Sequence, residues 1–177
     1  MGETIRAAQI FKFFAGEALR NLGDAVASVR PGVDVMMERE AVGIIGLITP
    51  WNFPIAIPAW KIAPALAFGN AVVMKPAELT PACAWELAKI LDEAGCPKGV
   101  FNLVLGSGSV VGACIAEHPD IDAVSFTGSV PTGRQIGVTC ASLGKKVQME
   151  MGGKNPMVVM DDADLDVAIG ACVNGAF

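Results

Sequence analysis

A short loop at residues 50–54 carries the first side chain suited to chemistry. It follows the apolar run GIIGLI, residues 43–48, which leaves no polar side for water and so predicts a strand buried on both faces. Pro50 and Pro54 cannot continue a central strand, so the chain leaves the sheet between them. The amide of Asn52 is then a neutral donor at the carboxyl end of a buried strand, the edge at which open α/β sheets bind ligands. Two interpretations are open: an oxyanion donor, or a turn residue that bonds its own backbone.

Two charged residues further along the chain, Glu150 and Lys61, are candidates for the same site. Glu150 ends a predicted strand at residues 147–150, and a carboxylate buried at such a strand end would be a suitable general base. The alternative is an acid that points into solvent. Lys61 lies in a largely apolar predicted helix, where it is either a snorkelling surface lysine or a buried partner of such an acid.

Three further strand-end loops resemble nucleotide contacts in their residue types. In FTGS, residues 126–129, a strand turns directly into a helix N-terminus, whose free N–H groups suit a pyrophosphate; the alternative is an ordinary turn with a serine cap. KPAE brings Lys75 and Glu78 to a strand end, where an acid can hold ribose hydroxyls; the alternative is a surface ion pair. The glycines at residues 106–108 are a weaker signal, and the usual GxGxxG fingerprint is absent.

Composition excludes several classes of function. The 177 residues are 53% hydrophobic with a net charge of −5 and no basic cluster, which argues against nucleic acid or an anionic membrane as a partner. Prolines and Lys61 interrupt the apolar runs before the roughly 20 residues that a bilayer requires, and the N-terminus has no signal-peptide pattern. Five cysteines without CxxC spacing beside a single histidine favour reduced thiols in a cytoplasmic protein and predict no metal site.

The predicted elements alternate between helices and strands, which indicates an α/β fold with a parallel sheet and helices on both faces. An amphipathic helix is expected at residues 3–21, with its apolar stripe on Ala8, Phe11, Ala15, Ala18 and Leu22, then a connection at residues 23–32 and an antiparallel strand at 33–40. The further strands are expected at residues 43–48, 71–74, 100–105, 123–126, 147–150 and 156–160, and the further helices at 56–68 (interrupted at Pro58 and Pro64), 80–95, 109–118, 129–144 and from 162 onward.

The last predicted helix begins at a capping Asp162 and places Cys172 on its apolar stripe, so we interpret Cys172 as a core residue. The apolar ending at Phe177 indicates a fragment of a longer chain, because terminal residues are more often polar.

Read together, TPWNFP, KPAE, FTGS and EMGG followed by KNP resemble the coenzyme-binding half of the aldehyde dehydrogenase superfamily, from Ala41 to Phe177. The resemblance implies a Rossmann-like coenzyme domain at residues 41–177, preceded by a helix that packs on it at 1–22 and a connection with an oligomerisation-type strand at 23–40. The catalytic domain would be absent. RPGVDV and the PWNFP run look most like the branch that oxidises 2-oxoglutarate semialdehyde, also called 2,5-dioxopentanoate.

The resemblance also implies roles for single residues. Asn52 matches the oxyanion donor, Glu150 the general base, and Lys61 a lysine that relays protons near that base. Met151 replaces the leucine that usually follows the family's glutamate. The residues matched to cofactor contacts are Ile48, Thr49, Pro50, Trp51, Lys75, Glu78, Gly108, Gly128, Ser129, Met151 and Gly152.

The family's nucleophilic cysteine lies in a loop beyond the end of this chain, so we expect the chain alone to be inactive. The implied cofactor is NAD or NADP, with NAD favoured, the substrate an aldehyde, and the assembly a homodimer or homotetramer. The competing hypothesis is a non-catalytic nucleotide-binding or interaction module from a truncated relative.

Overall fold

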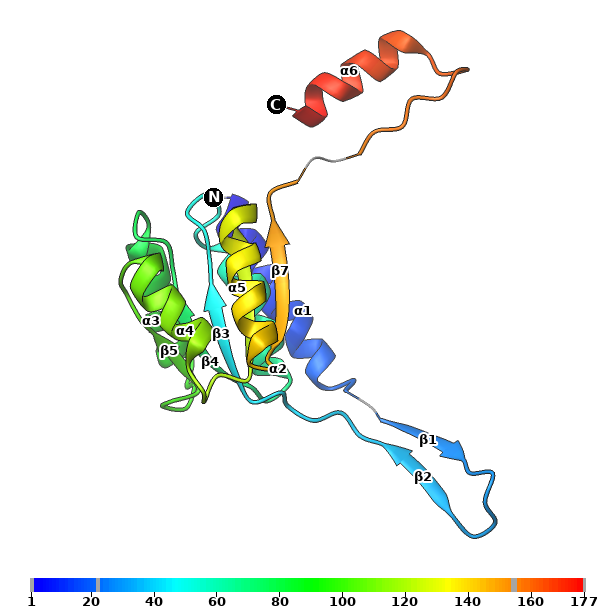
Figure 1. Ribbon diagram of the computed structural model, residues 1–177, viewed down its shortest axis with the longest axis vertical. Coiled ribbons are helices and arrows are strands. Elements are labelled where there is room, and N and C mark those ends of the chain that lie inside the picture. The colour runs from blue at the N-terminus through cyan, green and yellow to red at the C-terminus, as the bar shows by residue number, and fades with distance from the viewer. Residues whose placement is uncertain (1, 22, 154–155, 177) are drawn as a thin grey trace.

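The computed structural model describes residues 2–21, 23–153 and 156–176, and its centre is a five-stranded parallel sheet. The strand order is β5-β4-β3-β6-β7, which confirms the predicted doubly wound α/β fold (Figure 1). The strands are β3 (Ile44–Ile48), β4 (Ala71–Lys75), β5 (Phe101–Leu103), β6 (Ala123–Gly128) and β7 (Lys146–Met151). Expectations that concern Leu22, the lysine and asparagine of KNP, and Phe177 lie outside the described residues.

β3 lies in the middle of the sheet because its residues have no polar face to present to water. Leu47 is fully buried, and β3 pairs with β4 on one side and β6 on the other. Gly46 lets a helix approach this strand closely, because a Cβ at that position would collide with the side chain of Ile115.

The first face of the sheet is covered by α2 (Ala56–Ala67) and α3 (Pro81–Glu93). Their apolar side chains share a core with β3 and β4 that includes Leu47, Ile62, Val72, Met74 and Leu87. The expected interruption of α2 is wrong. Pro58 lies in the first turn, where a backbone N–H has no helical acceptor, and Pro64 is accommodated inside a continuous helix.

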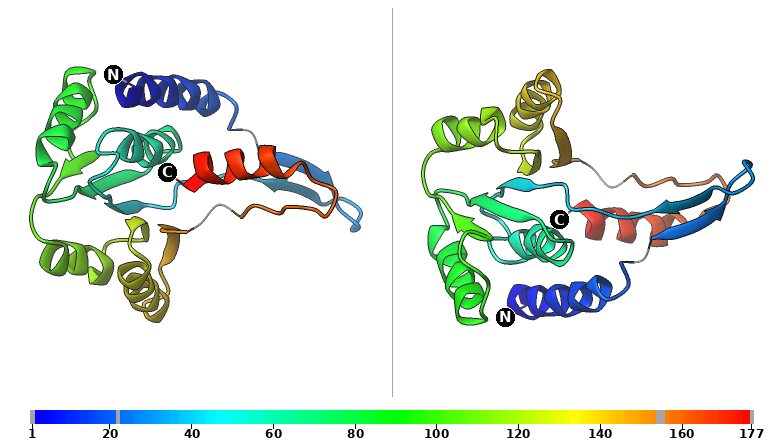
Figure 2. Two further views of the ribbon diagram at one scale, coloured as in Figure 1. Left: turned by 90° about the horizontal axis from the view of Figure 1, so that it is seen from above. Right: turned by 90° about the horizontal axis from the view of Figure 1, so that it is seen from below.

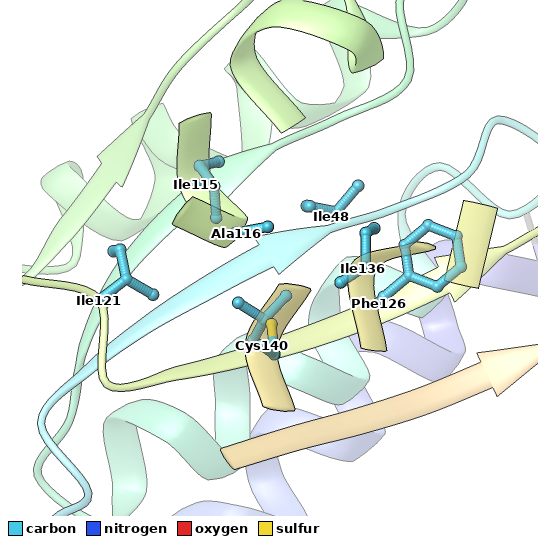
Figure 3. Close-up of a cluster of buried hydrophobic side chains, with 8 residues drawn as sticks. Ile48, Ile115, Ala116, Ile121, Phe126, Ile136 and Cys140 are labelled. Carbon is cyan, nitrogen blue, oxygen red and sulfur yellow. The ribbon is translucent and has the colours of Figure 1, made fainter. Parts of the chain in front are cut away.

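The second face is covered by a π-helical turn η1 (Gly108–Gly112), α4 (Ala113–Glu117) and α5 (Val130–Ser142). Figure 3 shows the core beneath them, in which Ile115 and Ala116 of α4 and Ile136 and Cys140 of α5 approach the strands. Figure 2 shows α1, α2 and α3 on one side of the sheet and α4 and α5 on the other.

The N-terminal helix α1 (Gly2–Ala18) packs against α2. The carboxylate of Glu3 accepts hydrogen bonds from the backbone amides of Ile55 and Ala56, each at 3.1 Å. Glu3 therefore caps α2, whose own N-cap residue is apolar.

The predicted helix is thus confirmed, but its expected stripe is wrong except at Phe11. Ala7 is the buried residue of α1, Phe11 is half-buried, and Ala8, Ala15 and Ala18 are exposed.

A two-stranded antiparallel hairpin leaves the body between α1 and the sheet (Figure 1). It consists of β1 (Asp24–Ala27) and β2 (Asp34–Met37), with Val26 paired to Val35. Residues 23–32 were expected to be an irregular connection, but residues 24–27 of this stretch form β1. Local sequence does not reveal this strand, because its hydrogen bonds come from β2. Both strands are exposed on both faces, whereas one buried face was expected for β2.

The C-terminal segment leaves the body after β7 and ends in α6 (Leu165–Ala176), which Figure 1 shows beyond the carboxyl ends of the strands. The strand expected at residues 156–160 is absent, because those residues are exposed and have no described neighbour with which to pair. The cap is Asp164 rather than Asp162: its Oδ1 accepts from the amides of Asp166 and Val167. Cys172 is exposed, so its interpretation as a core residue is wrong in this structure.

Candidate functional site

The sheet changes its winding direction at β3. The chain proceeds from β3 through β4 to β5 on one side, and β6 and β7 then pair on the other side of β3. The carboxyl ends of β3 and β6 therefore form the topological switch point, where doubly wound sheets bind ligands. Thr49, Pro50 and Trp51 follow β3 there, and Gly128 ends β6 beside them.

An open cleft of about 1130 Å³ extends from this switch point along the first face of β6 and β7. Asn52, Lys61 and Glu150 all line it, although they come from a loop, a helix and a strand. The predicted residues that share this cleft with them are Pro50, Trp51, Gly128, Ser129, Met151 and Gly152. The cleft thus contains one amide donor, one ammonium and one carboxylate.

Asn52 lies in an exposed turn that α2 follows directly. Within the described part of the chain its side chain makes no hydrogen bond to the backbone of its own loop, so its amide can donate into the cleft. Trp51 beside it is 60% exposed and provides a broad apolar wall.

Lys61 projects from α2 toward the sheet and is partly buried. Its Nζ donates to Ser125 Oγ at 2.6 Å and to Gln148 Oε1 at 3.0 Å. Burial lowers the pKa of Lys61 from 10.5 to about 8, and the negative charge of Glu150 partly opposes that effect. Lys61 is therefore not a snorkelling surface lysine. Its ammonium group shares the cleft with the carboxylate of Glu150.

Glu150 is exposed, so the expectation of a carboxylate buried at its strand end is wrong for this chain. The physical reason is that β7 is the edge strand and no described element covers the first face of its end. Met149 and Met151, which point to the other face, are half-buried and pack on the second core.

The turn after β6 has the predicted strand-to-helix geometry. Ser129 is the N-cap of α5, and its Oγ accepts from the amide of Thr132. A Cβ on Gly128 would lie 2.5 Å from the ring of Phe126, and a Cβ on Gly133 would collide with Met151. The two glycines therefore let the strand, the helix and the Phe126 ring pack together, which brings the positive end of α5 to the cleft.

Lys75 and Glu78 lie at the end of β4, one strand from the switch point and outside the cleft lining. The carboxylate of Glu78 accepts from the amide of Gly108 at 3.0 Å, which joins two of the predicted cofactor contacts. Lys75 is buried, and its ammonium donates to the carbonyl of Pro76 at 2.6 Å. Burial lowers the pKa of Lys75, and Glu78 opposes this effect through charge.

Buried polar atoms without hydrogen-bond partners bear on whether the carboxyl edge of the sheet could hold a nucleotide. The hydroxyls of Thr49, Thr80 and Thr127 are buried without a hydrogen-bond partner in the described structure; Thr80 precedes α3, whereas Thr49 and Thr127 lie at the ends of the adjacent strands β3 and β6. Burying a hydroxyl without a partner is costly, so such atoms indicate a missing ligand or water. A ligand reaching from the end of β4, which Glu78 follows, to Glu150 on β7 would cross three inter-strand spacings, about 14 Å. The edge therefore fits an elongated polar ligand, as a dinucleotide is.

Two residues of the cleft, Ser125 and Gln148, were not predicted. They are paired across β6 and β7 and both contact Lys61. A signal was present: KVQMEM, residues 146–151, alternates polar and apolar side chains, which is typical of a strand with one wet face.

Other possible chemistry at the described residues is limited. Cys140 lies in the second core, where burial raises its pKa, against the effect of Lys145, so its thiol is unsuited to attack. None of the described cysteines lines the cleft. His118 is the C-cap residue that follows α4. In the part of the chain that the structure describes, no cluster of metal-ligating side chains occurs and no helix is long and apolar enough to cross a membrane.

Comparison with known proteins decides the family. The sequence profile of the aldehyde dehydrogenase family matches residues 1–177. The chain belongs to the aldehyde dehydrogenase family.

Among its relatives, alpha-ketoglutaric semialdehyde dehydrogenase of Bacillus subtilis is 49% identical over 176 residues, which cover 99% of this chain and 36% of that protein. Betaine aldehyde dehydrogenase of the same organism is 46% identical over 170 residues, covering 96% of this chain and 35% of that protein. The crystal structure of betaine aldehyde dehydrogenase from Staphylococcus aureus in complex with NAD+ superimposes with a TM-score of 0.89 at 40% identity, covering 97% of this chain and 34% of that one. The chain thus spans about a third of the length of these aldehyde dehydrogenases.

Proposed function

We propose that this chain is the coenzyme-binding part of an NAD(P)-dependent aldehyde dehydrogenase that oxidises an aldehyde to a carboxylic acid. The observation that carries the proposal is the cleft in which Asn52, Lys61 and Glu150 meet beside the switch point of the sheet. Residues 41–177 would form the coenzyme-binding domain, with the helix at 1–22 packed on it.

Asn52 and Glu150 have roles in the reaction that their positions in the cleft support. The amide of Asn52 stabilises the oxyanion that forms when a thiolate adds to the aldehyde carbon. Glu150 is exposed to the cleft and acts as the base that removes a proton from the thiol or from the hydrolytic water. The cysteine would come from a part of the family fold that this chain does not span, because no described cysteine lines the cleft.

The residues that would hold the cofactor are distributed along the carboxyl edge. Gly128 and Ser129 present the N-terminus of α5, Trp51 lines the cleft, and Glu78, braced by Gly108, lies at the end of β4. A nicotinamide held at this edge would supply the acceptor for the hydride that leaves the substrate carbon. The unpartnered hydroxyls of Thr49 and Thr127 support a ligand at this edge.

We further propose a semialdehyde of the 2-oxoglutarate type as the substrate, supported by the 49% identity with the Bacillus subtilis enzyme of that name. The hairpin β1–β2 supports a homo-oligomer, because both of its edges have unpaired backbone groups. The five free cysteines support a cytoplasmic location.

The test is a chimera in which this chain replaces the matching residues of the Bacillus subtilis enzyme, assayed for NADH formation from the semialdehyde. We expect an active enzyme. Glu150→Gln should lower turnover by about 10²–10⁴-fold and Asn52→Ala by about 10²–10³-fold, because each removes a group that acts in the transition state.

The matched control is Glu117→Gln, an exposed acid on α4 away from the cleft, which should leave turnover unchanged. A folded but inactive chimera that still binds NAD would support the non-catalytic nucleotide-binding module instead. If the Glu150→Gln variant keeps full activity, Glu150 is not the general base.

A further inference from the structure

Lys61 is held by two polar side chains that have no role in the reaction described above. Its ammonium donates to Ser125 Oγ at 2.6 Å and to Gln148 Oε1 at 3.0 Å. The hydroxyl of Ser125 in turn donates to Gln148 Oε1. The three side chains therefore form a closed triangle in which the ammonium contacts two acceptors, and the Gln148 oxygen, not its NH2 group, must face Lys61.

The strand register brings this triangle to the same face as Glu150. Ser125 pairs with Gln148 across β6 and β7, and Thr127 pairs with Glu150 two residues further along. Because side chains alternate along a strand, Gln148 and Glu150 lie on one face and about 7 Å apart. All four side chains and Lys61 line the cleft.

Few charges surround the ammonium of Lys61. β3 and β6 carry no ionisable side chain, β7 contributes Lys146 and Glu150, and α2 has no charged residue besides Lys61. The charged residues of α1, which packs on α2, are Glu3, Arg6, Lys12 and Glu17. A partly desolvated ammonium in such surroundings depends on neutral acceptors, which Ser125 and Gln148 provide.

We propose that Ser125 and Gln148 are positioning residues that hold the amino group of Lys61 on the cleft side of the sheet and favour its protonated form. The catalytic consequence depends on the proposed function, whereas the geometry does not. In its neutral form Lys61 accepts, through water in the open cleft, the proton that Glu150 has removed from the thiol or from water: the O–H bond of Glu150 breaks, an N–H bond forms at Lys61, and the ammonium later releases the proton to solvent. The two neutral side chains thus set how readily Lys61 gains and loses that proton.

The test is an NMR titration of this chain with isotope-labelled lysine, in which Lys61→Arg identifies the Lys61 signal. The wild-type midpoint is expected at about 8. Gln148→Met removes an acceptor and should lower the midpoint by about 0.5–1 pH unit, because a hydrogen bond to a charged group favours that charge. Ser125→Ala should lower it also. Gln148→Glu adds a carboxylate of the same shape and should raise the midpoint by at least about 1 unit.

The matched control is Gln135→Glu on α5, which covers the opposite face of the sheet and should leave the Lys61 midpoint unchanged. Opposite shifts in the two Gln148 variants, with amide spectra that remain dispersed, would support the inference. Equal midpoints in all variants, shifts of the same sign, or a wild-type midpoint near 10.5 would overturn it. Because the titration needs neither aldehyde nor cofactor, its outcome is independent of whether the chimera is active.

Discussion

At the scale of single residues, Lys75 and Glu78 are close in sequence but have different environments at the end of β4. The ammonium of Lys75 is buried and bonded to the carbonyl of Pro76. The carboxylate of Glu78 is on an exposed residue and is anchored by the amide of Gly108. A lysine held in this way is poorly placed to pair with a phosphate at the surface. Glu78 therefore dominates the charge that an approaching ribose would meet.

The first residue-scale prediction follows from that charge. A carboxylate accepts hydrogen bonds from a ribose 2′-hydroxyl but repels a 2′-phosphate, so NAD should bind this chain more tightly than NADP. Glu78→Gln should strengthen NADP binding by on the order of tenfold, which corresponds to about 1.4 kcal/mol. Calorimetric titration of both cofactors measures this change.

Glu93→Gln is the control, because Glu93 is an exposed acid at the far end of α3. Equal affinities for NAD and NADP in the unmodified chain would show that Glu78 does not discriminate between them. An unchanged NADP affinity in Glu78→Gln would lead to the same conclusion.

At the scale of elements, the close approach of α4 to the sheet depends on one glycine. A Cβ at Gly46 would overlap the side chain of Ile115, which is buried in the core. We predict that Gly46→Ala lowers the free energy of unfolding by about 1–3 kcal/mol, because the added methyl overpacks a filled interior. Urea unfolding followed by circular dichroism measures the change.

Gly170→Ala is the matched control, since Gly170 lies inside α6 with no atom near the site of an added Cβ. It should be neutral or slightly stabilising, because alanine favours helix more than glycine does. If Gly46→Ala unfolds at the same urea concentration as the unmodified chain, then α4 is not packed on β3 as closely as described.

The elements also show what local sequence can predict. The buried strands β3, β4 and β6 and the helices α2, α3 and α5 were predictable because apolar runs, Pro at a helix start and Gly at a helix end are local signals. β1 was not, because its hydrogen bonds come from β2 and its own side chains are exposed. The strand expected at residues 156–160 failed for the converse reason: an apolar run requires a partner strand, and the described residues provide none.

Some residues of the candidate site could likewise be predicted from local sequence, and others could not. Asn52, Gly128 and Ser129 were candidates from loop chemistry and from the family resemblance, and the structure places all three at the cleft, since their positions depend on the strand just before them. Ser125 and Gln148 were missed, because their contact with Lys61 depends on the register of β6 with β7. The exposure of Glu150 likewise depends on β7 being the edge strand, which the order of elements along the chain does not determine.

At the scale of the whole molecule, two segments extend from the body (Figure 1), and both carry exposed apolar side chains. On α6, Leu165, Ile169 and Val173 are 66%, 60% and 54% exposed, and they form one stripe at helical spacing. On the hairpin, Met36 is 69% exposed beside unpaired strand edges. Contiguous apolar surface of this kind promotes association, as do open strand edges.

We therefore predict that this chain associates in solution, and sedimentation velocity over a range of concentrations should show species heavier than the 18.3 kDa monomer. Ile169→Glu combined with Leu165→Glu should shift the distribution toward monomer, because it places charge in the middle of the α6 stripe.

Val138→Glu is the control: Val138 is 71% exposed on α5 but belongs to neither segment, so its replacement should change little. A hairpin variant, Met36→Glu, separates the two surfaces. If only this variant dissociates the assembly, the hairpin forms the contact and α6 does not. A monomer of the unmodified chain at every concentration would show that neither the hairpin nor α6 drives association.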